Sequence, residues 1–66
     1  MKIRLNGKPK EFPDTLVLTS LVEQFCKDKN PVIAELNGKI IKLEQWEETS
    51  IKEGAVVELV SFVGGG

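Results

Sequence analysis

The chain has 66 residues, of which 41% are hydrophobic and 29% charged, and its formal net charge is −1. A chain of this length forms one small domain that buries only about 60% of the surface of its unfolded form, which leaves little room for an enclosed active site. The near-neutral charge argues against binding to nucleic acid or an anionic membrane through a basic surface. The sequence has no histidine and one cysteine, which excludes a histidine-based catalyst, a thiolate zinc site and an intramolecular disulfide.

No stretch has the length and apolarity of a signal peptide or a membrane span. We therefore expect a soluble cytoplasmic protein that is not an enzyme. We expect no nucleic acid, membrane, metal ion or cofactor bound to it.

The N-terminal segment has the pattern of a β-hairpin. Residues 1–5 alternate apolar and polar side chains, as in a strand with one buried face. Asn6-Gly7 follows, a strong two-residue hairpin signal because both positions accept a positive φ. A second strand is predicted over residues 8–12, and Pro9 favours an edge position for it because proline lacks a backbone donor.

Apolar residues then recur with the spacing of an amphipathic helix, at Leu18, Leu21, Val22, Phe25 and Cys26. This stripe predicts one main helix whose start is capped by Thr19 or Ser20. The position of Cys26 on the stripe favours a small core residue over a sulfur-relay thiol.

A second hairpin is predicted around Asn37-Gly38, between residues 32–36 and 39–43. A two-residue loop pairs Ala34 with Ile41, and Val32 with Leu43. Residues 43–48 are then predicted to form a short helical turn that places Trp46 over the core. The last and longest strand is predicted over residues 55–63.

The order of elements is strand, strand, helix, strand, strand, strand. Such a short chain buries its helix stripe only if the helix lies across one face of a mixed sheet of about five strands. Placing the first strand between the second and the last gives the compact arrangement, an α+β fold of the β-grasp (ubiquitin-like) type. We assign residues 1–63 to this domain and residues 64–66 to a flexible glycine tail.

The last strand also predicts a surface for a partner protein. If Val57 and Leu59 face the helix, then the outward side of this strand carries Glu58, Val60 and Phe62. Ile40 and Ile33 are expected beside them. Exposed apolar side chains that gather beside the glycine tail are typical of a partner-binding surface.

A β-grasp order that ends in glycines resembles the ubiquitin-like sulfur carriers, and within them the ThiS family of thiamine (thiazole) biosynthesis. The resemblance covers essentially the whole chain. Its most specific parts are residues 2–7, the helical Leu21-Val22-Glu23, Asn37-Gly38 with Ile40-Ile41, and the ending Phe62-Val63-Gly64-Gly65-Gly66. The third glycine is a departure from a simple Gly-Gly ending.

The resemblance implies that the Gly66 carboxylate is adenylated by an E1-like activating enzyme, which uses ATP and Mg²⁺. A sulfur donor protein then converts the adenylate to a thiocarboxylate, and the carrier delivers its sulfur to thiazole synthase. Gly64 and Gly65 form the tail that threads into both partners, because glycine has no Cβ and lets the backbone approach closely.

Other functions fit the same residues. The tail chemistry also suits a carrier for molybdopterin or amino-acid sulfur transfer. The fold alone also suits a β-grasp interaction module or a protein modifier. In the simplest alternative the three glycines are only a frayed end.

Overall fold

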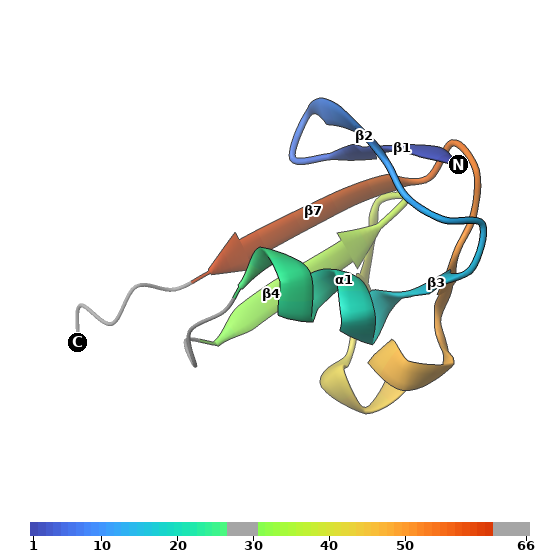
Figure 1. Cartoon of the computed structure of the whole chain (residues 1–66). Coiled ribbons are helices and arrows are strands. Elements are labelled where there is room, and N and C mark those ends of the chain that lie inside the picture. The colour runs from blue at the N-terminus through green and yellow to red at the C-terminus, as the bar shows by residue number, and fades with distance from the viewer. Residues whose placement is uncertain (27–30, 62–66) are drawn as a thin grey trace.

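The structure is a computed structural model, and it describes residues 1–26 and 31–61. The chain forms seven strands, one α-helix and one 3₁₀ helix within these residues (Figure 1). Their order and bounds are β1 (Lys2–Leu5), β2 (Lys8–Glu11), β3 (Leu16–Val17), α1 (Leu18–Phe25), β4 (Val32–Leu36), β5 (Lys39–Ile41), η1 (Leu43–Glu48), β6 (Ser50–Ile51) and β7 (Val56–Ser61).

The main sheet has five strands in the order β2-β1-β7-β4-β5. β1 pairs with β2 antiparallel and with β7 parallel, as the sequence predicts for the first strand. β7 is the middle strand of the sheet, because β4 pairs with its other side in antiparallel register. The two segments that lie farthest apart in the sequence are therefore neighbours at the centre of the fold (Figure 1).

Both predicted Asn-Gly hairpins are present. The φ angles are 52° and 82° at Asn6 and Gly7, and 51° and 86° at Asn37 and Gly38, which are values that these two residue types tolerate best. The predicted edge position of the Pro9 strand is confirmed, because β2 ends the sheet.

The predicted pairs of the second hairpin are half right. Ala34 pairs with Ile41, but β5 ends there, so Val32 and Leu43 are not a pair. Leu43 instead begins η1, the predicted helical turn, and is 69% exposed. The turn holds Trp46 half-buried against the core, where its Nε1 donates a hydrogen bond to the Ile41 carbonyl oxygen at 2.9 Å.

The predicted side-chain cap of the helix is wrong. α1 begins directly after β3, with Val17 at the N-cap position and no side-chain cap. The Leu18 N–H instead donates to the Thr49 carbonyl oxygen at 2.9 Å. β3 pairs with β6 in a separate two-stranded sheet that brings these segments together.

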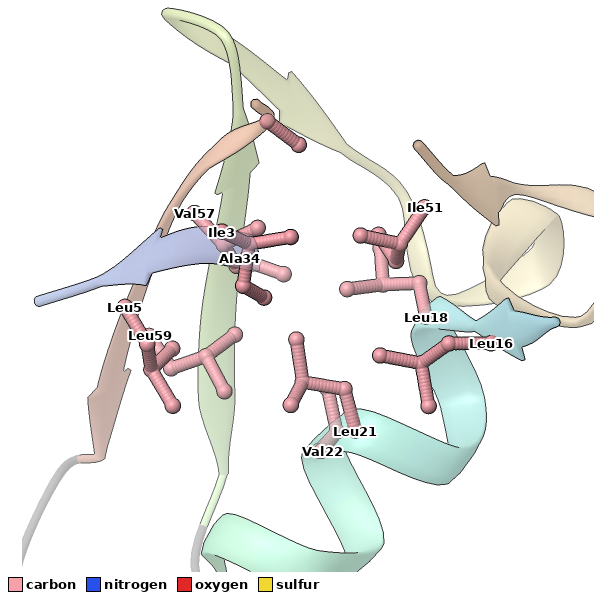
Figure 2. Close-up of a cluster of buried hydrophobic side chains, with 11 residues drawn as sticks. Ile3, Leu5, Leu16, Leu18, Leu21, Val22, Ala34, Ile51, Val57 and Leu59 are labelled. Atoms are coloured by element: carbon pink, nitrogen blue, oxygen red, sulfur yellow. The ribbon is translucent and has the colours of Figure 1, made fainter. Parts of the chain in front are cut away.

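The core lies between α1 and one face of the main sheet. In Figure 2, Leu18, Leu21 and Val22 of the helix point toward the inward side chains of the sheet. The buried cluster has eleven members: Ile3, Leu5, Leu16, Leu18, Leu21, Val22, Ala34, Ile51, Ala55, Val57 and Leu59. This single helix across a mixed five-stranded sheet confirms the predicted β-grasp fold.

The C-terminal part of the predicted helix stripe is less buried than the pattern indicates. Phe25 is 43% exposed, and Cys26, at the C-cap position, is half-buried. Phe25 lines a groove of about 480 Å³ between the β1–β2 hairpin and α1, together with Leu5, Asn6, Lys8, Lys10, Glu11, Phe12, Leu21 and Gln24. Phe25, the last residue of α1, therefore lines a groove rather than the core.

Candidate functional site: the open sheet face and the end of β7

β7 leads from the centre of the sheet toward the predicted tail. Its last described residue is Ser61, which pairs with Val32 of β4. Phe62, Gly64, Gly65 and Gly66 lie outside the described residues, so their roles remain predictions. The candidate site in the structure is therefore the strand that carries the tail and the sheet surface around it.

Asn6 holds β7 on the side of β1. Its side-chain Oδ1 accepts a hydrogen bond from the Leu59 N–H at 2.8 Å, and its Nδ2 donates to the Leu59 carbonyl oxygen at 3.2 Å. The Asn6 backbone N–H donates to the Val57 carbonyl oxygen at 2.9 Å. The side-chain amide thus continues the parallel β1–β7 ladder beyond the point where β1 ends.

Asn37 holds β7 on the side of β4. Its Oδ1 accepts from the Val56 N–H at 2.9 Å, and its own N–H donates to the Val56 carbonyl oxygen at 2.7 Å. The Asn-Gly sequence predicts both turns, but it gives no signal that their side chains bind a strand about 20 to 50 residues further along the chain. Both turns position β7 and so the start of the tail.

The sheet face opposite α1 is open and carries exposed apolar side chains. Val57 and Leu59 are buried at 0% and 3% exposure, whereas Val60 is 50% exposed. The predicted alternation of β7 is therefore confirmed within the described residues. The exposed apolar residues of this open face are Ile33 (37%), Ile40 (67%), Val56 (41%) and Val60 (50%).

The predicted surface residues Val60 and Ile40 share the open face but are not neighbours. Val60 lies directly opposite Ile33 on β4, and Ile40 lies on β5, one strand further. Two strand spacings separate β7 from β5, or about 10 Å. Ile33 pairs with Val60, whereas Glu35 is the residue of β4 that lies opposite Ile40. Val56 extends the apolar surface along β7.

The described residues offer no metal site and no membrane span. Residues 1–26 and 31–61 contain no group of three His, Cys, Asp or Glu side chains arranged to hold a metal ion. Within the same part of the chain, no helix is long and apolar enough to cross a membrane.

The β-grasp domain and the glycine ending that follows it can be compared with known proteins. A family model described as the ThiS family matches residues 3–66, which is nearly the whole chain. The chain belongs to the ThiS family. The match includes the glycines that lie beyond the described residues.

Proteins similar to this ThiS-family chain include a curated sulfur carrier protein ThiS from Bacillus subtilis, which is 35% identical over 97% of this chain and 98% of its own length. The crystal structure of a thiamine biosynthesis protein (ThiS) from Geobacter metallireducens is 34% identical. It covers all of both chains with a TM-score of 0.81. The solution structure of a thiamine biosynthesis protein from the same organism is 33% identical, with a TM-score of 0.82 over all of this chain and 88% of the other.

A longer relative is also similar. A thiazole synthase from Paramagnetospirillum magneticum is 27% identical over the full length of this ThiS-family chain, which spans only 20% of that protein. A protein named for thiazole synthesis therefore contains a segment that is similar to this chain.

Proposed function

We propose that this chain is the sulfur carrier of thiazole formation in thiamine biosynthesis, and that Gly66 carries the sulfur. An activating enzyme uses ATP and Mg²⁺ to join the Gly66 carboxylate to AMP, with release of pyrophosphate. A hydrosulfide ion supplied by a donor protein then attacks the carbonyl carbon, the bond to AMP breaks, and loss of one proton leaves a thiocarboxylate. The carrier is a co-substrate of its partner enzymes rather than an enzyme itself.

One observation carries the proposal: the ThiS family match extends from β1 through the C-terminal glycines. The fold supports it, because β7 is held on both sides by neighbouring strands and by Asn6 and Asn37. The strand that precedes the tail is therefore a rigid base. The five residues from 62 to 66 reach at most roughly 17 Å beyond it.

This limited reach explains why a docking surface is needed beside β7. The reacting carbon has to meet its partner atom at about 3 to 3.5 Å inside another protein's active site. The open face around Val60 and Ile33 lies at the base of the tail, so a partner bound there is within the reach of Gly66. We assign this surface to thiazole synthase, because a ThiS-like segment is part of the polypeptide of the P. magneticum thiazole synthase.

The proposal is tested by mass spectrometry of the purified chain after incubation with the activating enzyme, ATP and a sulfur source. We expect a mass gain equal to the exchange of one oxygen for sulfur, which fragmentation places on Gly66. Deleting Gly65 and Gly66 should abolish the gain because the reactive carbon is withdrawn by up to ~7 Å. The fold should survive, since the described core contains no residue of the tail.

Two outcomes would contradict the proposal. One is a truncated chain that still acquires sulfur, and the other is a full-length chain modified only at Cys26.

A genetic experiment distinguishes the possible pathways. A strain that lacks the gene for this chain should regain growth when thiazole is supplied. A strain that instead requires molybdopterin or a sulfur amino acid would assign the carrier to a different pathway, and lysine-linked conjugates would indicate a protein modifier.

A further inference from the structure

The open face contains a pair of carboxylates that the carrier chemistry of Gly66 does not use. Glu35 of β4 and Glu58 of β7 are direct partners in the antiparallel register. Both lie on the open face, because their neighbours Ala34, Val57 and Leu59 are buried on the other side. Residues directly opposite in such a pair have Cβ atoms about 4.5–5.5 Å apart, and like charges there destabilise the sheet.

No lysine or arginine forms an ion pair with either glutamate within residues 1–26 and 31–61. The ion pair found in that part of the chain joins the N-terminal ammonium of Met1 to Asp14, at 3.7 Å. Arg4 lies on the open face opposite Val56, but its Nη2 is 3.5 Å from the Gly7 carbonyl oxygen rather than beside a carboxylate. Within the described part of the chain, the two glutamates therefore face each other across the strands without an ion-pair partner.

Apolar side chains lie beside the two glutamates on β4, β5 and β7. Val56 and Val60 flank Glu58 along β7, Ile33 precedes Glu35 along β4, and Ile40 lies opposite Glu35 on β5. These four side chains are 37% to 67% exposed. A protein that covers them also removes water from the carboxylates at their centre. Burying carboxylates is costly unless the partner supplies a cation with matching hydrogen bonds.

We propose that the thiazole synthase surface that covers this face places an arginine between Glu35 and Glu58. A planar guanidinium has five N–H donors, so it can bind two carboxylates at once, and it is less strongly hydrated than a lysine ammonium. The arginine is surrounded by apolar side chains that pack on Ile33, Ile40, Val56 and Val60. This inference rests on the proposed function, since it concerns a partner of the sulfur carrier.

The test measures two quantities, the affinity for thiazole synthase and the melting temperature of the free carrier, and only the affinity should fall. Glu35→Gln and Glu58→Gln each remove one negative charge and keep the shape of the side chain. We expect each variant to bind thiazole synthase about tenfold or more weakly in calorimetry, because a desolvated charge pair is lost. The melting temperature of the free carrier should stay the same or rise, because the repulsion across the two strands is relieved.

Glu23→Gln is the matched control. It makes the same change of charge at an exposed position of α1, on the opposite side of the sheet, and should leave the affinity unchanged. Binding of the wild type should also weaken more steeply with added salt than binding of the doubly substituted Glu35→Gln, Glu58→Gln chain.

Mass spectrometry shows whether Gly66 is loaded with sulfur. This measurement distinguishes a failure of the present inference from a failure of the proposed function. If the wild type is never loaded, the proposed function fails, and this inference with it. If the wild type is loaded but the glutamine variants bind the synthase with unchanged affinity, the inference alone is overturned. Variants that bind normally but aggregate would show that the glutamates only keep the open face soluble. Variants impaired only in adenylation would assign the face to the activating enzyme.

Discussion

The two faces of the sheet are made by alternate residues of the same strands, yet they differ in what covers them. Along β7, Val57 and Leu59 are buried against α1, whereas Val56, Glu58 and Val60 are exposed. Both faces are rich in β-branched and aliphatic residues. The comparison indicates that apolar content alone does not mark the core of this domain. The helix defines the core, and the uncovered apolar face is available to another protein.

The largest difference between the faces should appear in stability. Leu59→Ala removes a side chain that is 3% exposed, so we expect the free energy of unfolding to fall by about 2–5 kcal/mol. Val60→Ala, one residue further and on the open face, should change it by about 0.5 kcal/mol or less. Urea denaturation of both variants measures this contrast. Equal losses would mean that the open face is covered in the isolated chain.

The reverse contrast is expected in partner binding. The alternation of β7 predicts that Phe62 faces outward, although it lies outside the described residues. Phe62→Ala should weaken binding to the activating enzyme or to thiazole synthase by ~2 kcal/mol or more, because exposed aromatic residues are frequent hot spots. Calorimetry measures the affinity and circular dichroism monitors the fold. A collapsed fold would place Phe62 in the core, and an unchanged affinity would remove it from the interface.

The distinction between the faces depends on the register of β7, because a slip of one residue would turn every side chain to the other side. Asn6→Asp keeps the acceptor for the Leu59 N–H but replaces the amide donor with a carboxylate beside the Leu59 carbonyl oxygen. We expect a loss of about 1–2 kcal/mol in the free energy of unfolding. Asn37→Asp is the matched control, since the described Oδ1 contact with the Val56 N–H survives. Equal losses would show that the second Asn6 hydrogen bond is unimportant.

The smallest effect is expected at the helix. The Oγ1 of Thr19 is buried and has no hydrogen-bond partner among the described residues. Thr19→Val removes this hydroxyl and keeps the branched shape, so thermal unfolding should show a gain of up to ~1 kcal/mol. Thr19→Ser keeps the hydroxyl and should show no gain. A destabilised valine variant would indicate that the hydroxyl has a partner in solution.

Features of the fold that depend on local patterns could be predicted from the sequence. Asn6-Gly7 and Asn37-Gly38 predict both hairpins, because few other dipeptides accept two consecutive positive φ angles. The alternation of residues 55–61 predicts the two faces of β7. For the site, the pattern predicts that Val60 and Ile40 share the open face, and this placement is confirmed. Their role in binding a partner stays a prediction.

The features that could not be predicted depend on contacts between distant segments. β3 and β6 have two residues each, too few to show a period, and they pair across the sequence at Leu16 and Ile51. The backbone carbonyl of Thr49 accepts a hydrogen bond from the first N–H of α1, a contact with a distant segment that the local capping pattern does not indicate. The Glu35–Glu58 pair likewise exists only because of the β4–β7 register.

The position of β7 also has a consequence for how the protein folds. β1 and β4 have no contact with each other in the sheet order, because β7 separates them. Without β7, the main sheet consists of two separate hairpins, and isolated hairpins are marginally stable in water. β7 joins the two hairpins into one sheet, so we expect folding to require nearly the whole chain. We therefore expect truncated chains that lack β7 not to reach the folded state, so that every folded carrier contains the strand from which its tail begins.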